Sequence, residues 1–196
     1  ATIGMMVVHP DFQRLGIGRR LMEEILLWID ARGCPAAILE ATAVGQPLYA
    51  SLGFQPFDST LRYKNTTNLV INPEDSRALE MTAEHFHNLV EFDRNMFGAD
   101  RSRILMRYMQ DYPHRTFISL NSGEDVIGYV ICGHNQIGPW VSLDIHSARD
   151  LLDAALSLAY AEGPAVIIPA ADQPGLIMLE GNGFDDTRGC THMVRG

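Results

Sequence analysis

The feature that most constrains the fold of this 196-residue chain is that the chain resembles itself. Four landmark residues recur at one constant spacing: Gly33, Gly45, Gly53 and Phe54 return as Gly163, Gly175, Gly183 and Phe184. The apolar positions between these landmarks largely match. Self-similarity on this scale indicates a duplicated structural unit, so we expect two related units in one chain.

The first repeat contains a strand, a glycine-rich turn and a helix within the stretch VVHPDFQRLGIGRR, from Val7 to Arg20. Apolar residues from 2 to 8 predict the strand, and apolar residues at helical spacing before Gly33 predict the helix. N–H groups at a helix start have no intrahelical partner and lie at the positive end of the helix dipole, so they favour phosphate. Gly16 and Gly18 would let a phosphate approach the main chain. The alternative is a tight turn whose glycines only allow the helix to pack on the strand.

The rest of the chain alternates between strand and helix signals, which is typical of an α/β protein. In the first repeat we expect a buried strand at 36–39, a short helix at 47–52 and a strand at 54–64. A polar linker at 65–75 precedes the second unit, at 76–196. In that unit we expect helices at 78–97, 101–112, 148–161 and 175–182, and strands at 116–120, 126–132, 137–143 and 165–168.

The two repeats differ where ligand chemistry is expected. Where the first repeat has HPDFQRLGI, the second has the shorter LDIHS, which contains no glycine. Tyr49 of the first repeat aligns with Leu179, and Thr42 aligns with Asp172. The second repeat is therefore predicted to keep the fold without the phosphate site.

The motif Q-x-x-G-x-G after the strand end V-x-P resembles the acyl-CoA pyrophosphate loop of the GNAT superfamily of N-acyltransferases. The segment L-Y-x-x-x-G-F, at 48–54, is similar to a motif common in that superfamily. The sequence departs from the superfamily pattern at Thr42 and Gly45, where asparagine and alanine are common. With FGADRS and IGPWV in the second repeat, the whole layout resembles that of tandem-GNAT acetyltransferases.

This resemblance implies an α/β fold of two GNAT-like units, each a mixed, mostly antiparallel β-sheet flanked by helices. Residues 1–64 would be the C-terminal part of the first unit, 65–75 the linker, and 76–196 a degenerate second unit. The first unit would be truncated at its N-terminus, because about 70 residues, the counterpart of 67–136, have no equivalent before Ala1. We therefore expect the sequence to be a fragment of a longer chain.

The resemblance also implies roles for individual residues, with acetyl-CoA as the co-substrate. Main-chain N–H groups near Val7 and Val8 would hold the pantetheine arm and the carbonyl, and Tyr49 would be the general acid for the departing thiolate. The pyrophosphate would be held by a loop formed by Gln13, Arg14, Leu15, Gly16, Ile17, Gly18 and Arg19. Taken alone, Tyr49 would be interpreted as a core tyrosine with a hydrogen-bonded hydroxyl. Its place in L-Y-x-x-x-G-F favours the catalytic role.

A general base for the acceptor amine is harder to identify. Glu40, near the end of a predicted strand, is the best carboxylate in the first repeat, and a solvated strand-end residue is the alternative. The base would otherwise lie in the segment that the first repeat lacks. The histidines show no metal-ligand spacing with a matched carboxylate, so we expect no metal site.

Composition limits the partners. The formal net charge of −9 argues against nucleic acid, which needs a basic face. The sequence has no apolar run long enough to span a membrane and no basic signal-peptide start, so we expect a cytoplasmic protein with no membrane partner. The expected partner is an amine acceptor, on a small molecule or a protein, and a homodimer is compatible with the sequence.

The predicted function is acetyl-CoA-dependent N-acetyltransfer. The main alternative is a non-catalytic acyl-CoA-binding or dimerising module. A dinucleotide-binding protein is a third reading, with Glu40 as the ribose ligand, but the loop lacks the third glycine of that motif.

Overall fold

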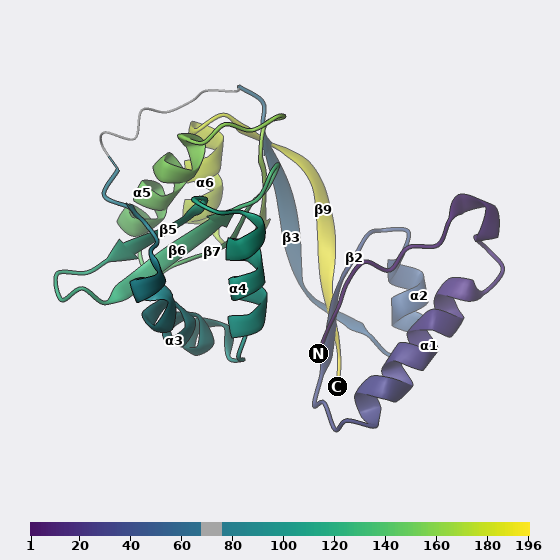
Figure 1. Cartoon of the computed structure of the whole chain (residues 1–196). Helices are drawn as coiled ribbons and strands as arrows, with labels where there is room; N and C mark the ends of the chain where they lie inside the picture. Colours follow the sequence, from purple (N-terminus) through teal and green to yellow (C-terminus); the bar gives the residue numbers. More distant parts are fainter. Residues whose placement is uncertain (68–75) are drawn as a thin grey trace. The chain divides into compact units, whose positions relative to one another are not determined.

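The computed structural model describes residues 1–67 and 76–196, and only the backbone of Arg188. The chain divides into two compact units (Figure 1). Unit 1 comprises residues 1–62, 168–171 and 187–196, and unit 2 comprises residues 63–167 and 172–186. The long strands β3 (Gln55–Asn65) and β9 (Phe184–Arg195) belong to unit 1 over part of their length and to unit 2 over the rest.

Unit 1 is built on strands that follow the order β1-β2-β9-β3, in a sheet that continues to β8 (Ala165–Pro169). Its other elements are β1 (Thr2–Ile3), the 3₁₀ helix η1 (Pro10–Phe12), α1 (Ile17–Asp30), β2 (Ala37–Ala41) and α2 (Gln46–Ser51). β1 runs parallel to β2, whereas β2 runs antiparallel to β9. The last strand of the second repeat therefore lies inside the sheet of unit 1.

The core of unit 1 lies on one face of this sheet. α1 is amphipathic, and its buried residues Met22, Leu26 and Ile29 pack against a cluster that includes Leu39 and Met193. Figure 1 shows α1 and α2 beside each other. Half-buried side chains of α2 complete the same cluster, so both helices cover a single face.

Side chains also tie β9 to unit 1. The Arg195 guanidinium donates two hydrogen bonds of 3.0 Å to the carboxylate of Asp30, at the end of α1. These bonds hold the pKa of Asp30 below its ordinary value. The Gln46 amide of α2 donates to the hydroxyl of Thr191. The end of β9 is thus anchored to both helices.

Unit 2 contains a second sheet in the order β4-β5-β6-β7, with every neighbouring pair antiparallel. Its strands are β4 (Leu79–Glu80), β5 (Thr116–Leu120), β6 (Val126–Cys132) and β7 (Ile137–Ser142). Its helices are the 3₁₀ helix η3 (Ala83–His85), α3 (Phe86–Phe97), α4 (Ser102–Asp111), α5 (Ile145–Leu156) and α6 (Gln173–Gly181). α3 and α4 bury Leu89 and Leu105 against one face of β5 and β6.

Helix α5 approaches β6 at Gly128. A methyl group at this glycine would lie 2.8 Å from the Ser147 hydroxyl oxygen and 3.0 Å from Leu151, so a larger residue would force the helix away. The Ser147 hydroxyl is held in turn by Ser142 of β7, at 2.9 Å. This close approach fixes the start of α5 on the sheet.

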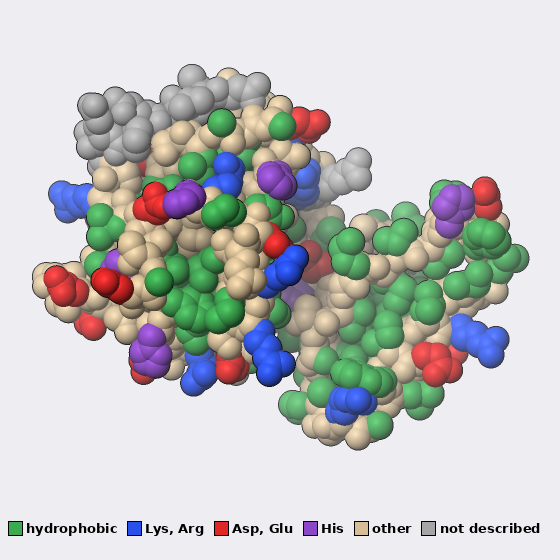
Figure 2. Space-filling view, in the orientation of Figure 1, with side chains coloured by type: hydrophobic (Ala, Val, Ile, Leu, Met, Phe, Trp, Pro, Cys, Tyr) green, Lys and Arg blue, Asp and Glu red, His purple; other side chains and the backbone are tan. Residues whose placement is uncertain are grey.

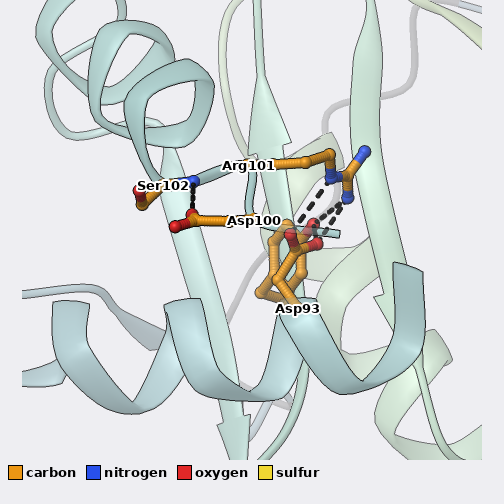
Figure 3. A network of polar contacts seen from close by, with 5 residues as sticks. Asp93, Asp100, Arg101 and Ser102 are labelled. Carbon is orange, nitrogen blue, oxygen red and sulfur yellow. Dashed lines mark hydrogen bonds and ion pairs between the residues drawn. The ribbon is translucent and has the colours of Figure 1, made fainter. Parts of the chain in front are cut away.

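A buried polar network joins α3, α4 and β6 (Figure 3). Asp93, 1% exposed, receives two hydrogen bonds from the Arg101 guanidinium and one of 2.6 Å from the Tyr129 hydroxyl. Beside it, the Asp100 carboxylate accepts the N–H of Ser102 at 2.9 Å, at the first residue of α4. Because a buried charge without its partner is destabilising, this network positions α4 on α3.

Strands predicted at 116–120 and 126–132 are confirmed with the same bounds, as β5 and β6. Three predicted elements have clearly different bounds. The helix predicted at 148–161 is α5, which begins at Ile145, where Asp144 caps it, and ends at Leu156. The strand predicted from 2 to 8 ends at Ile3, since Met5 adopts a φ of 57° and turns the chain away from β2. The helix predicted from 78 begins at Phe86, because β4 pairs with β5 and Thr82 forms a capping box before the helix.

The compact units follow different boundaries from the predicted ranges 1–64 and 76–196, because β9 pairs with β2. Of the predicted linker 65–75, residues 68–75 lie outside the described residues. Asn65 ends β3, and its amide donates to the carbonyl of Asn182 at 3.1 Å. Within the described ranges, the helices are all too short or too polar to cross a membrane. The same residues include no group of three or more His, Cys, Asp or Glu arranged for a metal ion.

Candidate active site

The glycine-rich loop ends in a helix whose first turn has no side-chain cap. Gly16 is the N-cap residue of α1, with φ at 78°, in the left-handed region that favours glycine. Arg14 also has a positive φ, of 61°. The first N–H groups of α1 have no intrahelical partner. A Cβ atom at Gly16 would meet no atom within 4 Å, so the space beside this helix start is open.

Gln13 holds the shape of the loop. Its side-chain amide donates to the Val8 carbonyl at 3.0 Å, and its N–H donates to the Pro10 carbonyl at 3.1 Å. These bonds tie the loop back to the end of the preceding segment. Gln13 therefore positions the loop, while the N–H groups at the start of α1, which lack an intrahelical acceptor, come from the residues after it.

The two arginines of the loop differ in the hydrogen bonds and ion pairs that they form. Arg19 donates to the Ser51 hydroxyl of α2 at 2.6 Å and lies 3.6 Å from the carboxylate of Glu23. Arg14 is exposed, and no ion pair joins it to another residue in the described part of the chain. Arg14 is thus the loop cation available to an anionic ligand, whereas Arg19 joins α1 to α2.

Strands β1 and β2 diverge just before the loop. They pair only at Thr2 with Ile38 and at Ile3 with Leu39. After Ile3 the chain leaves β2, and among the described residues no main-chain hydrogen bond is donated by Val7 or Val8. Val7 is 76% exposed. Among the described residues, Val7 and Val8 therefore offer main-chain donors without a main-chain acceptor, in the segment that follows β1.

Apolar side chains surround this segment. In the space-filling view, hydrophobic side chains gather on the visible face over the N-terminal loop and α1 (Figure 2). Phe12 and Leu15 of the loop are exposed, Leu15 by 69%. Val8 contacts the start of α1, where a Cβ atom on Gly18 would lie 3.7 Å from its methyl group. A ligand on the loop would meet main-chain N–H groups and apolar surface together.

Tyr49 lies in α2, half-buried against the core of unit 1. Its ring packs edge-on against Phe54, with the ring centroids 6.1 Å apart. A methyl group on Gly45 would lie 2.9 Å from the Tyr49 ring, which explains a glycine at that position. Within the described ranges the Tyr49 hydroxyl has no hydrogen-bond partner. Burial raises the pKa of this hydroxyl above its ordinary value, so Tyr49 remains a proton donor.

Glu40 lies on the other face of the sheet. It is exposed on β2, next to the last residue that pairs with β1. Its partner on β9 is His192, which sequence reasoning considered only as a metal ligand. The alternation of side chains along β9 could have indicated which face of the sheet His192 lies on. The pairing of β9 with β2, however, cannot be predicted from local sequence.

The corresponding helix start in the second repeat is occupied by the chain itself. Asp144 is the N-cap of α5, and its carboxylate accepts the N–H groups of His146 and Ser147, both at 2.9 Å. A carboxylate here satisfies the donors that a phosphate would use. The sequence signal was an aspartate just before the helix, which the predicted start at 148 placed outside it. At the Tyr49 position, Leu179 is fully buried.

The repeats share one polar feature. The Thr42 hydroxyl accepts the N–H of Gly45 at 3.3 Å before α2, and the Asp172 carboxylate accepts the N–H of Gly175 at 3.1 Å before α6. Both side chains bond to the residue three positions on. The exchange of threonine for aspartate therefore preserves a side-chain hydrogen bond to the main chain at the entry to the helix, which supports the alignment of the two repeats.

Comparison with known proteins agrees with this picture. Residues 1–56 match one family of acetyltransferase (GNAT) domains, and residues 89–196 match another. Over 129 residues the chain is 30% identical to the uncharacterized N-acetyltransferase YitH of Bacillus subtilis, covering 65% of this chain and 45% of YitH. Over 71 residues it is 37% identical to the [ribosomal protein bS18]-alanine N-acetyltransferase of Escherichia coli, covering 35% of this chain and 48% of that protein. The chain spans about half the length of these relatives.

Solved structures share the fold. A putative acetyltransferase from Pyrococcus horikoshii superposes with a TM-score of 0.81 at 25% identity, over 100% of this chain and 65% of that one. A tandem GNAT protein from the clavulanic acid biosynthesis pathway superposes with a TM-score of 0.59 at 12% identity, over 98% of this chain and 74% of that one. At 12% identity, the similarity to the tandem GNAT protein shows only a shared fold.

Proposed function

Because the chain belongs to the GNAT acetyltransferase family, we propose that unit 1 binds acetyl-CoA and transfers its acetyl group to an amine. The observation that carries this proposal is the uncapped start of α1, where Gly16 offers no side-chain cap to the first N–H groups and the space beside its Cα is open. Such a helix start is suited to a pyrophosphate. Arg14, which forms no ion pair with a described residue, adds a positive charge in the same loop. The main-chain N–H groups of Val7 and Val8, which donate to no main-chain acceptor in the described part of the chain, would hold the pantetheine arm.

Acetyl-CoA would supply an acyl group already activated as a thioester. Tyr49 would protonate the departing sulfur, since its hydroxyl has no partner in the described part of the chain and its raised pKa keeps the proton in place at neutral pH. Glu40 faces the opposite side of the sheet, where the acceptor amine would approach. Acid and carboxylate therefore lie on opposite faces of the sheet, with Glu40 one residue beyond the last pair of β1 with β2.

The test is thiol release from acetyl-CoA in the presence of a panel of primary amines, with the acetylated product identified by mass spectrometry. The panel includes a peptide with an N-terminal alanine, because a relative of this chain is an alanine N-acetyltransferase. We expect at least one amine to be acetylated. Binding of CoA without thiol release for any amine would favour the alternative, a non-catalytic acyl-CoA-binding module.

A further inference from the structure

The face of unit 1 opposite its core carries an acid and a histidine side by side. Leu39 and Met193 are opposite each other and point into the core. Side chains alternate along a strand, so the next pair, Glu40 and His192, points to the other face. Directly opposite residues of an antiparallel pair have Cβ atoms about 4.5–5.5 Å apart. A single small group of a ligand, such as an amine, can therefore contact both side chains.

His192 is held in place without using its nitrogens. Its half-buried ring packs against Phe57 of β3, with the ring centroids 4.7 Å apart and the planes at 46°. In the described part of the chain, no hydrogen bond or ion pair engages either ring nitrogen. Of the described titratable groups on this face, Glu40 comes from β2 and Cys190 from β9. Burial, and then Glu40, raise the pKa of the Cys190 thiol, so this group stays neutral.

Phe57 gives the same face an apolar wall. Its side chain is 59% exposed although it contacts His192. Ile38 and Val194, the next opposite pair along β2 and β9, are half-buried on this face. A cation carried on an apolar group would find the Glu40 carboxylate, the His192 nitrogens and a hydrophobic surface together.

Resting on the proposed acetyl transfer, we propose that His192 is the base that takes the proton from the acceptor amine, and that Glu40 draws the amine to this face. The acceptor is a primary amine on an apolar or aromatic group that packs against Phe57. A strand of the second repeat thereby supplies a catalytic residue to the first, which gives that repeat a role beyond structure.

The proposed acetyl transfer conserves protons and electrons. The bound ammonium first releases one proton to solvent. The neutral amine nitrogen then forms the bond to the thioester carbon and loses a second proton to His192. The carbon–sulfur bond breaks, its electron pair leaves on sulfur, and the sulfur receives the Tyr49 proton. The proton on His192 then returns through solvent to the Tyr49 phenolate, which restores both side chains. The products are the amide and the free thiol, without any oxidant or further reactant.

The kinetic test compares three variants on phenethylamine. H192A should lower kcat/KM by ~10²–10⁴-fold, the usual contribution of a general base, with an unchanged Kd for CoA. Added imidazole should restore part of this loss in H192A but not in H192Q, whose side chain fills the space. H114A is the matched control, because His114 of unit 2 is another histidine near a glutamate, with its Nδ1 2.7 Å from the carboxylate of Glu80. An H192A rate equal to the wild type, or a loss that imidazole does not restore, overturns the assignment.

A second measurement decides the amine site without turnover. The His192 Cε1–H resonance, identified by its loss in H192Q, is followed while phenethylamine is added to the protein with CoA present. We expect this resonance to shift, the His114 resonance to stay in place, and E40Q to weaken the titration. A His192 resonance that does not respond overturns the amine site. A clear shift in a protein that acetylates no amine leaves the amine site standing and refutes the acetyl transfer.

Discussion

The starts of α1 and α5 are the same element in the two repeats, yet one is open and the other is closed. At α1 the N-cap is Gly16, which offers no side chain to the first N–H groups. At α5 the N-cap is Asp144, whose carboxylate binds two of them at 2.9 Å. An anion or a polar cap stabilises a helix start, and the second repeat provides its own cap. The comparison teaches that one local exchange separates the proposed ligand site from a capped helix start.

The same division extends to the next helix of each repeat. Tyr49 keeps a hydroxyl without a partner in the described part of the chain, whereas Leu179 only fills the core. Both helices retain a side-chain hydrogen bond to the main chain at their entry, from Thr42 and from Asp172. The fold has therefore been preserved in both repeats, while the groups that could act on a ligand remain in one.

The largest loss of activity is expected from a change at Tyr49, which has no counterpart in the second repeat. Tyr49→Phe keeps the ring that packs on Phe54 and removes only the proton donor, so we expect kcat to fall by ~10²–10⁴-fold with little change in the Kd for acetyl-CoA. Steady-state kinetics and calorimetric titration measure the two quantities. Full turnover in this variant would make Tyr49 a packing residue like Leu179.

Gly16→Val tests the open helix start. Valine is strained at a φ of 78°, and such strain costs about 1–3 kcal/mol, so the loop should deform and the CoA affinity should fall by roughly 5- to 150-fold. Calorimetric titration with CoA gives the affinity, and circular dichroism checks the fold. Gly181→Ala is the control, because Gly181 of α6 has open space and no positive φ. Unchanged affinity in folded Gly16→Val would remove the loop from the binding site.

The two loop arginines should respond differently. Arg14→Gln removes the cation that has no ion pair among the described residues, and we expect CoA binding to weaken by about 1 kcal/mol, in the range of an exposed charge contact. Arg19→Gln should affect binding less and lower the thermal stability of unit 1, since Arg19 bonds to Ser51. Titrations of both variants at low and high salt measure the difference. Equal losses of affinity would mean that Arg19 also faces the ligand.

Asp144→Ala tests whether the Asp144 carboxylate alone prevents an anion from binding at the start of α5. Loss of an aspartate cap destabilises a helix by about 1 kcal/mol, so thermal unfolding should shift slightly downward. We expect one acyl-CoA per chain in both the wild type and this variant, because the second repeat lacks the glycine turn and has Leu179 in place of Tyr49. A second bound CoA in the variant would show that the fold of the second repeat still contains a latent site.

By itself, the sequence determined the features that depend on near neighbours. Constant spacing of the glycines revealed the duplication, and alternation placed β5 and β6 with their observed bounds. The glycine turn located the start of α1, because backbone conformation there depends on Gly16 itself. The loop and Tyr49 followed from motifs whose residues lie within one or two turns of each other.

Only the tertiary structure decided which strand completes unit 1. β9 is far from β2 in the sequence, and any strand with the right alternation satisfies a hydrogen-bond ladder, so local pattern cannot choose the partner. That choice brings His192 opposite Glu40 and ties Arg195 to Asp30. It also explains why unit 1 includes the end of the second repeat. Residues from the two ends of the chain meet because burying one face of β2 and β9 under α1 and α2 fixes their register, and the opposite face follows from that register.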